Sequence, residues 1–448
     1  MKIFLIAIGG KVMSELALYL KLQGHTVLGS DDEIFEPTRS RLIESQLMPE
    51  KLGWDPKRID TSIEAIILGK HAFKDNPELL RAKELNIPVY SFPEYIQGLI
   101  TNKKRIVVSG TCGKTTTTAL IINALEQHGL DPDYLIGGEW KCKSKSGLKL
   151  SNSSIIVLEG DEYVSSALDD TPKMYYYNPD ILIVNNIYWD HINVFSDFTS
   201  YRKIFIEYFS MLSKDTIVIY NQEDATVNEI VDKSFNFIRV PFTTPEYHVC
   251  GNRYIVAHNG NEFFTNLLGR HNMQNIAAAA SACQAIGIDI NKFYKYTENF
   301  TGIRNRMELV AHSEEASLYV DFAHNYAKVR ETLKAFKETF PDAPLIACLE
   351  LYNYSCSSFE YIPLLREGLV FADYVIIYIS PHNKRASELL MLSADQLMDI
   401  INIHENIHFS STKEGLIAFV NQLPYRKKTI VMMSSGNFDH ISFNKIMV

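Results

Sequence analysis

Residues 109–120 read SGTCGKTTTTAL and follow the apolar run RIVVS at residues 105–109. The run predicts a buried strand, and the pattern of residues 115–127 predicts a helix directly after the turn. A strand that leads through a glycine-containing turn into a helix points backbone N–H groups and the positive helix end at one spot, where polyphosphate binds. The residues predicted to bind phosphate here are Gly110, Thr111, Gly113, Lys114, Thr115 and Thr116.

The turn departs from the standard phosphate-loop pattern GxxxxGK[ST], because Val108 stands where the first glycine is expected. The alternative interpretation is a structural turn followed by an incidental Lys-Thr pair. The strand before the turn and the helix after it favour phosphate binding. Lys114 adds a mobile positive charge, and Thr115 adds a hydroxyl ligand for Mg²⁺.

The composition is that of an ordinary globular protein. Of 448 residues, 46% are hydrophobic and 22% are charged, and the formal net charge of -9 argues against a surface built to bind nucleic acid or anionic lipid. The apolar run at residues 1–8 is too short for a signal peptide or a membrane span, and the six cysteines contain no CxxC pair. The sequence therefore predicts a cytoplasmic protein with reduced thiols and no membrane insertion, and it carries no signal of an oligomeric state.

Hydrophobic periodicity predicts an α/β protein with parallel sheets. Strand patterns such as residues 3–8 and 26–28 alternate with helical patterns such as residues 12–23. Boundaries near residues 100 and 300 divide the chain into residues 1–100, 101–298 and 299–448. We expect a Rossmann-like N-terminal domain, a central P-loop ATPase domain and a Rossmann-like C-terminal domain. The alternating residues 248–269 predict a β-hairpin added to the central domain.

Two further segments place acidic residues and a histidine at predicted strand ends. These are LEGDEY at residues 158–163 and NNIYWDH at residues 185–191. Glu159 with Thr115 and phosphate oxygens is a sensible ligand set for Mg²⁺, whereas His191 is a less usual partner for so hard a cation. Taken alone, these residues also fit solvated loop acids and a structural histidine.

The first block begins with a glycine-containing turn, AIGGKVMSELA at residues 7–17. Gly9 and Gly10 form only a poor dinucleotide fingerprint, because Lys11 and Ser14 stand around them. Asp31 or Asp32 falls about twenty residues further on, where a ribose-binding acid is expected. A structural turn followed by a solvated loop is the alternative.

Six segments together resemble the Mur ligases, the ATP-dependent amide-forming family of bacterial cell-wall synthesis. They occur in the family's order between residues 110 and 329, and the resemblance as a whole covers essentially the full length of the chain: GTCGKTTTT (110–118), EGDEY (159–163), NNIYWDHINVF (185–195), GRHNMQNIAAA (269–279), FTGIRNRMELV (300–310) and VDFAHNYAKV (320–329). The acidic loop at residues 159–179 and the final MMSSGNFDHI (432–441) most resemble the family's murein peptide ligases, and the L-alanine-adding ligases rank second.

The resemblance implies ATP and Mg²⁺ as cofactors, and UDP-N-acetylmuramate with an amino acid or tripeptide as substrates. It implies catalytic roles for Lys114, Glu159, His191 and Arg306, with the metal held by Thr115, Glu159 and His191. The expected ATP contacts are the phosphate-loop residues together with Asn272, Asn275, Arg306 and Asp321. His324 is expected to line the cleft near the peptide. The expected UDP-sugar contacts are Gly9, Gly10, Ser30, Asp31 and His71.

Some positions depart from the family pattern. Cys112 replaces the usual histidine or asparagine of the phosphate loop, which adds an oxidisable thiol. Residues 325–328 read NYAK where a proline is expected, Lys203 is a weak match to the carbamylated lysine of some relatives, and LELYNYSCSS (349–358) lacks a peptide-binding arginine. Cys112 and the altered segment at residues 325–328 leave open a nucleotide-binding regulatory protein without turnover, and a simple P-loop phosphotransferase is the second rival hypothesis.

Overall fold

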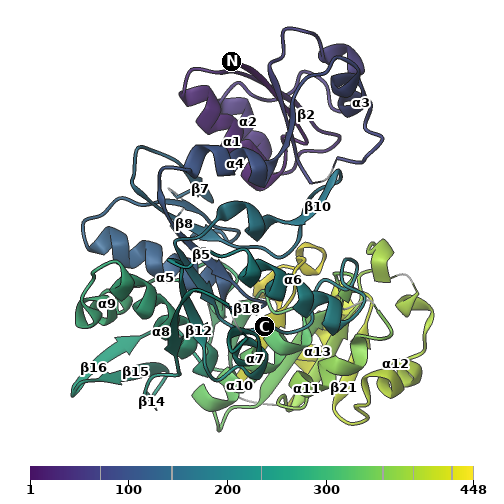
Figure 1. The fold of residues 1–448 in the computed structure, drawn as a ribbon. Coiled ribbons are helices and arrows are strands. Elements are labelled where there is room, and N and C mark those ends of the chain that lie inside the picture. Colours follow the sequence, from purple (N-terminus) through teal and green to yellow (C-terminus); the bar gives the residue numbers. More distant parts are fainter. Residues whose placement is uncertain are drawn as a thin grey trace.

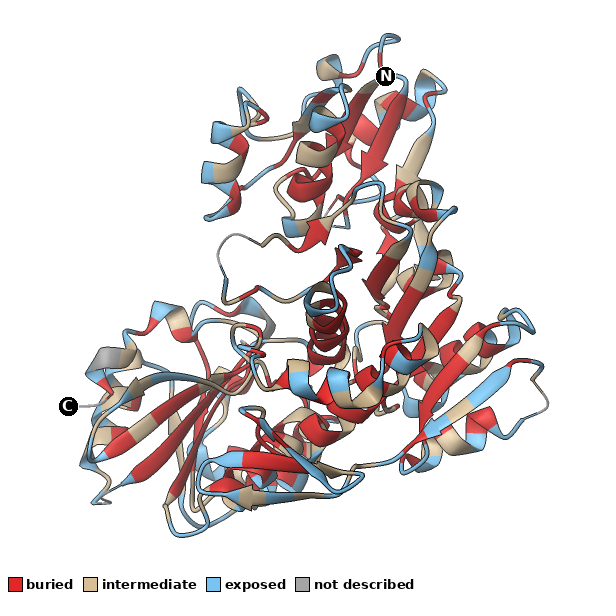
Figure 2. Cartoon of the chain, turned by 90° about the vertical axis from the view of Figure 1, so that its left-hand side faces the viewer, coloured by how far each residue is buried: buried red, intermediate tan, exposed pale blue. Residues whose placement is uncertain are grey.

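The structure, a computed structural model, has three sheet-based parts that follow one another along the chain (Figure 1). It describes residues 1–70, 72–142, 145–233, 235–355, 358–386, 388–424 and 427–446. The N-terminal part lies at the top of the view, and the central and C-terminal parts lie below it. Buried residues concentrate in the strands and in the helix faces packed on them (Figure 2).

The N-terminal sheet is parallel, with strand order β2-β1-β3-β4. Its strands are β1 (Lys2–Ile6), β2 (Thr26–Ser30), β3 (Ala65–Leu68) and β4 (Val89–Ser91). Its helices are α1 (Lys11–Leu22), α2 (Thr38–Glu44), α3 (Pro77–Glu84) and α4 (Phe92–Ile100). The strand predicted over residues 3–8 ends early, because Ala7 has a φ of 66° and begins the turn into α1.

The central sheet has seven strands in the order β13-β12-β11-β5-β8-β6-β7, and only β7 runs antiparallel to its neighbour. The strands are β5 (Lys104–Ser109), β6 (Asp133–Leu135), β7 (Leu148–Lys149), β8 (Ile155–Glu159), β11 (Ile181–Val184), β12 (Ile217–Asn221) and β13 (Ile238–Phe242). The predicted strand and helix around the phosphate loop are confirmed, since β5 leads directly into α5 (Lys114–Gln127).

The central helices are α5, α6 (Phe198–Ser210), α7 (Ala225–Val231), α8 (Arg270–Ala285) and α9 (Ile290–Thr297). Helix α5 is buried on nearly all sides, and α8, whose residues 277–280 are buried alanines, packs against it. Small residues let packed helices approach closely, and Asn275 of α8 lies against Gly113 of the phosphate loop.

Two small antiparallel additions accompany the central sheet. Strands β9 (Val164–Ser166) and β10 (Asp169–Pro172) pair with each other. Strands β14 (Tyr247–Cys250), β15 (Arg253–His258) and β16 (Asn261–Thr265) form a meander at the lower left of Figure 1. The hairpin predicted over residues 248–269 is therefore confirmed, with one strand more than a simple hairpin.

The C-terminal sheet has the order β17-β18-β22-β19-β20-β21, and only β17 runs antiparallel to its neighbour. The strands are β17 (Glu308–His312), β18 (Ala316–Asp321), β19 (Leu345–Glu350), β20 (Tyr374–Tyr378), β21 (Ile407–Ser410) and β22 (Lys428–Met433). The helices are α10 (Tyr326–Thr339), α11 (Arg366–Leu369), α12 (Ala394–Ile401) and α13 (Lys413–Gln422).

The predicted fold class is confirmed: the protein is α/β, with three successive parallel or mainly parallel sheets covered by helices. The boundaries at residues 100 and 298 stay predictions. Among the described residues, no helix is long and apolar enough to cross a membrane.

Candidate active site

A cleft of about 900 Å³ lies where the three parts of the chain meet. Its lining includes residues that follow the carboxyl ends of β1, β3, β5, β8, β11, β18, β19 and β22. In parallel α/β sheets, ligands bind at this edge of the sheet. Three sheets that share no strand therefore turn their ligand-binding edges toward one space.

The phosphate loop is shaped by its glycines and by Asn186. Gly113 has a φ of 85°, and a Cβ atom at this position would lie 2.2 Å from the Asn275 Oδ1 atom. The backbone N–H of Thr111 donates to the Asn186 carbonyl at 3.0 Å, and that of Cys112 donates to the Asn186 side-chain oxygen at 2.8 Å. Backbone contacts therefore hold the loop, and the Cys112 side chain is not needed for its shape. Burial raises the pKa of the Cys112 thiol to about 12, which disfavours the reactive thiolate.

Lys114 opens helix α5 and points back over the loop. Its Nζ atom donates to the Gly110 carbonyl at 2.6 Å and to Glu162 Oε2 at 2.7 Å. Burial lowers the pKa of Lys114, but the carboxylates of Glu162 and Asp161 outweigh burial and raise it above the ordinary lysine value. The lysine is therefore a fixed cation, and its acidic partner is Glu162, a residue that the sequence did not single out.

Thr115, Glu159 and Arg306 meet at the next position of the cleft. The Thr115 hydroxyl donates to Glu159 Oε1 at 2.9 Å, and the Gly137 N–H donates to Glu159 Oε2 at 2.8 Å. Arg306 comes from the segment before β17, and its Nη2 atom contacts the Thr115 hydroxyl at 3.3 Å. The structure therefore brings three predicted residues from two parts of the chain together. The hydroxyl and carboxylate oxygens are a donor set that fits Mg²⁺.

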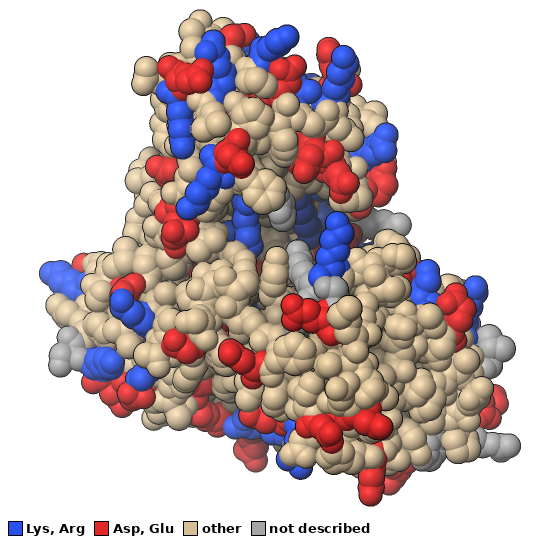
Figure 3. Space-filling view, turned by 90° about the vertical axis from the view of Figure 1, so that its right-hand side faces the viewer, with Lys and Arg blue, Asp and Glu red and all other residues tan. Residues whose placement is uncertain are grey.

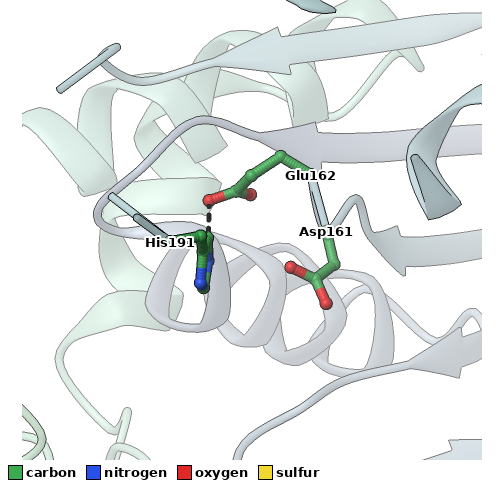
Figure 4. Close-up of side chains that lie close together, drawn as sticks. All are labelled: Asp161, Glu162 and His191. Atoms are coloured by element: carbon green, nitrogen blue, oxygen red, sulfur yellow. Dashed lines mark ion pairs between the residues drawn. The ribbon is translucent and has the colours of Figure 1, made fainter. Parts of the chain in front are cut away.

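His191 belongs to a separate acidic group. Ligand atoms of Asp161, Glu162 and His191 all lie within 4.8 Å of one another, and His191 Nε2 is 3.3 Å from Glu162 Oε1 (Figure 4). Burial opposes protonation of His191, but Asp190 and Glu162 raise its pKa above the usual value. The metal set predicted from Thr115, Glu159 and His191 is therefore divided, with the histidine beside Asp161 and Glu162 instead of Glu159.

The other predicted nucleotide contacts also line the cleft. On α8, the Asn275 amide donates to Asn272 Oδ1 at 3.0 Å, and Asn275 Oδ1 accepts from Asn185 at 3.3 Å. The carboxylate of Asp321 accepts the Met307 N–H at 2.8 Å, which fixes the backbone directly after Arg306. Asp321 therefore also positions the arginine segment.

His324 is buried in the cleft wall and is held at both ring nitrogens. Nδ1 lies 2.6 Å from the Phe322 carbonyl, so it carries the proton, and Nε2 lies 3.3 Å from the Lys328 Nζ atom. Burial, together with the Lys328 charge, lowers the pKa of His324 to about 3. His324 is therefore neutral near pH 7, and its Nε2 atom accepts from the Lys328 ammonium group.

Asp190 joins the central and C-terminal parts. Its side chain is 2% exposed, and Oδ2 accepts from Asn325 at 2.5 Å and from Lys328 at 3.3 Å. The Ser355 hydroxyl contacts Oδ1 at 3.4 Å. Asn325 and Lys328 belong to the NYAK segment that departs from the family pattern. The unusual residues therefore form an interdomain contact, which sequence reasoning missed.

Four of the five predicted UDP-sugar residues, Gly9, Gly10, Ser30 and Asp31, follow or end strands of the N-terminal sheet at its carboxyl edge, but they are not among the residues that line the cleft. Asp31 Oδ2 accepts the Gly9 N–H at 2.6 Å, and the Ser30 hydroxyl contacts the buried Glu78. Gly10 begins α1 as its N-cap. His71 lies outside the described residues. Among the described residues of this sheet and its helices, the cleft is lined by Lys11, Val12, Met13, Gly69, Lys70 and Phe92.

Asp31 predicts a pH dependence of stability. Burial raises its pKa to about 6 despite the Gly9 N–H bond, so its contribution to stability is present at low pH and is lost as the pH rises through about 6. As the pH rises from about 4 to about 7.5, ionisation of Asp31 should lower the free energy of unfolding by about 2 kcal/mol. Urea unfolding should show Asp31→Asn gaining this amount over the wild type across that range. An unchanged difference between the two proteins would contradict the raised pKa.

The structure also bears on Lys203 and on the segment that follows β19. Lys203 lies on α6 with its side chain 72% exposed and pairs with Glu207 at 3.5 Å, so it is not positioned to be a carbamylated metal ligand in the cleft. The wall after β19 includes Asn353, Tyr354 and Ser355, which are neutral. This agrees with the missing peptide-binding arginine in that segment.

Comparisons with known proteins match the three parts of the chain. The family descriptions "Mur ligase family, catalytic domain", "Mur ligase middle domain" and "Mur ligase, glutamate ligase domain" match residues 2–104, 108–283 and 305–436. A UDP-N-acetylmuramate–L-alanine ligase of Caldicellulosiruptor saccharolyticus is 30% identical over 394 residues, which cover 84% of this chain and 83% of the relative.

A UDP-N-acetylmuramate–L-alanyl-gamma-D-glutamyl-meso-2,6-diaminoheptandioate ligase of Haemophilus influenzae is 26% identical over 462 residues, covering 98% of this chain and 97% of that protein. A crystal structure of a murein peptide ligase from Psychrobacter arcticus has the same fold, with a TM-score of 0.71, 21% identity and coverage of 100% of this chain and 98% of the other. The chain belongs to the Mur ligase family of ATP-dependent amide-forming ligases.

Proposed function

We propose that this enzyme joins the amine of an amino acid or peptide to the lactyl carboxylate of UDP-N-acetylmuramate, with ATP as the energy source. The main support is the contact of Arg306 with Thr115, which brings a cation of the C-terminal part to the phosphate loop. Lys114 and Glu159 stand beside this contact in the same cleft. A simple P-loop phosphotransferase would not need a site shared by three sheets.

The proposed reaction has two steps. A carboxylate oxygen of the sugar acid attacks the γ-phosphorus of ATP, and ADP leaves. The amine nitrogen then attacks the acyl carbon, gives up a proton, and inorganic phosphate leaves. The reacting species carry negative charge, so Lys114 and Arg306 act by charge stabilisation and positioning. In the proposed reaction, the Lys114 ammonium leaves Glu162 and contacts phosphate oxygens of ATP instead.

Thr115 and Glu159 are the proposed ligands of Mg²⁺, which neutralises charge on the transferring phosphoryl group when it is bound. We assign Asn272 and Asn275 to the nucleotide, and His191 with its acidic neighbours to the acyl-phosphate side of the cleft. Asp321 holds the arginine segment in place and lines the cleft, and we also assign it to the nucleotide ribose.

The tripeptide L-alanyl-gamma-D-glutamyl-meso-diaminopimelate is the first candidate acceptor. Its support is the Haemophilus influenzae ligase named for this peptide, which aligns with nearly the whole chain. L-alanine is the second candidate, because the Caldicellulosiruptor saccharolyticus relative is named for it and has higher identity over a shorter range.

The rate of phosphate release distinguishes the tripeptide from L-alanine as the acceptor. With ATP, Mg²⁺ and UDP-N-acetylmuramate present, we expect release to require an acceptor and to be at least about tenfold faster with the tripeptide than with L-alanine. L-alanyl-D-glutamate serves as an intermediate-length control, and mass spectrometry identifies the amide. A preference for L-alanine would select the second candidate. Absence of amide with every acceptor would support a nucleotide-binding protein without turnover.

A further inference from the structure

Two residues of helix α1 contact one loop of the central part. Lysine and arginine side chains gather around the hollow below the N-terminal part (Figure 3), and Lys11 is among the lysines that line the cleft. Lys11 and Glu15 are four residues apart, so they lie on the same face of α1. The Lys11 Nζ atom donates to the carbonyl oxygens of Gly138 at 3.0 Å and Gly137 at 3.4 Å. The Gly147 N–H donates to Glu15 Oε1 at 2.9 Å.

These contacts join the N-terminal part to the β6–β7 loop, residues 136–147, which lies below α1 in Figure 1. The Ile136 N–H donates to the Gly147 carbonyl at 2.8 Å, so the two ends of the loop are also bonded to each other. The Glu15 side chain is 4% exposed and accepts a second hydrogen bond from Arg41 of α2 at 3.0 Å. Glu15 is therefore held both within the N-terminal part and by the loop.

The start of the same loop packs against both proposed ligands of Mg²⁺. The Gly137 N–H donates to Glu159 Oε2 at 2.8 Å. A Cβ atom at Gly138 would lie 2.4 Å from the Thr115 Cγ2 atom, so the loop backbone lies directly against this side chain. Gly137 therefore contacts both Lys11 and Glu159, and a shift of the loop would move the carboxylate.

The β6–β7 loop also contacts the segment that carries Arg306. The Glu139 carbonyl accepts the Arg304 N–H at 2.8 Å, and Trp140 forms a β-bridge with Ile303. All three parts of the chain therefore meet at this loop.

We propose that Lys11 and Glu15 are positioning residues for the Mg²⁺ site, and that α1 sets the orientation of Glu159 through the β6–β7 loop. This inference rests on the proposed function, in which Thr115 and Glu159 hold the metal. Replacing a group that orients a metal ligand typically lowers metal affinity by about 10- to 100-fold. The placement of the N-terminal part thereby determines how tightly the central part holds Mg²⁺.

Calorimetric titration of the full chain with the ATP analogue AMP-PNP, in Mg²⁺ and in EDTA, tests this assignment. The affinity in Mg²⁺ divided by the affinity in EDTA reports how much the metal strengthens nucleotide binding. In Lys11→Met we expect this ratio to fall about tenfold, because affinity falls in Mg²⁺ and changes by less than about twofold in EDTA. Lys11 is exposed, so its replacement removes no core packing.

Variants of Glu15 add a second test. Glu15→Ala removes the acceptor of the Gly147 N–H and should also lower the ratio about tenfold, whereas Glu15→Gln keeps an oxygen there and should stay within about threefold of the wild type. Because Glu15→Ala also loses the Arg41 contact, urea unfolding is measured beside it. A merely structural role would lower the free energy of unfolding and leave the ratio unchanged.

A double-mutant cycle shows whether Lys11 acts through the proposed metal ligand. Glu159→Ala should itself lower the ratio, and adding Lys11→Met to it should have no further effect. The matched control is Lys21→Met, which removes a lysine of the same helix that donates to the Ser45 carbonyl at 2.7 Å within the N-terminal part. Its ratio should equal that of the wild type.

An unchanged ratio in either Lys11→Met or Glu15→Ala, or effects of Lys11→Met and Glu159→Ala that simply add, would overturn the positioning role and leave the proposed function intact. An equal loss of affinity in Mg²⁺ and in EDTA would overturn it as well, since the loop would then act on the nucleotide. A rise in the ratio would mean that Lys11 acts on the metal by its charge instead. A wild-type protein with the same AMP-PNP affinity in Mg²⁺ and in EDTA would overturn the magnesium site of the proposed function itself.

Discussion

Replacement of Lys114 by Met should lower the kcat of ATP-dependent amide formation by about 10³-fold. The lysine contacts the turn of the phosphate loop, where its Nζ atom lies 2.6 Å from the Gly110 carbonyl. Loss of one such group from a transferring phosphoryl or developing oxyanion typically costs about 4 kcal/mol of transition-state stabilisation. Steady-state ADP release with saturating substrates measures the effect.

Because Lys114 also neutralises buried Glu162, the single variant leaves an unpaired acid and loses stability. Lys114→Met/Glu162→Gln removes that problem and should fold like the wild type while remaining inactive. The matched control is Lys295→Met, which removes an exposed lysine of helix α9 paired with Glu298. A double variant with more than one tenth of the wild-type kcat would show that phosphate chemistry does not depend on this lysine.

Replacement of Asp190 by Ala should destabilise the contact between the central and C-terminal parts by about 3–5 kcal/mol. The carboxylate is buried and accepts hydrogen bonds from Asn325 and Lys328, so its removal leaves the Lys328 ammonium without its acidic partner. We expect a lower urea midpoint for the C-terminal part. Activity should fall as well, because Arg306 belongs to the part that this contact orients.

A double-mutant cycle separates the ion pair from the other contacts. Asp190→Ala/Lys328→Met should recover part of the stability lost in Asp190→Ala, since it removes the unpaired cation. Glu207→Ala breaks the exposed Lys203–Glu207 pair and should cost less than about 1 kcal/mol. If the effects of Asp190→Ala and Lys328→Met simply add, the two groups do not stabilise each other.

Local geometry made the phosphate loop predictable from the sequence. A strand, a glycine turn and a helix follow one another without interruption, so residues 105–127 alone predict that Lys114 and Thr115 begin the helix after the turn. Glu159 was predictable for a similar reason, because it ends strand β8 next to the loop. The family resemblance was predictable because six motifs occur in the family's order along the sequence.

Contacts between distant parts could not be predicted in this way. Whether Lys114 pairs with Glu159, Asp161 or Glu162 depends on the direction of each side chain after β8, and the spacing in sequence does not set it. Lys11 was visible as an unusual residue in a glycine turn, but its partners lie 126 and 127 residues away. The placement of one sheet against another decides such contacts, and periodicity within a segment carries no information about it.

The meeting of three strand edges at one cleft has an evolutionary consequence. The phosphate loop is built by the second sheet, whereas the loops after β19 and β22 that border the opposite wall are built by the third. Under the proposed function, we expect substitutions in those outer loops to alter which amine is accepted and to leave the energy-transfer chemistry unchanged. If the acceptor binds there, descendants of one ancestral scaffold would diversify in acceptor choice through short loop changes while the nucleotide-binding residues stay the same.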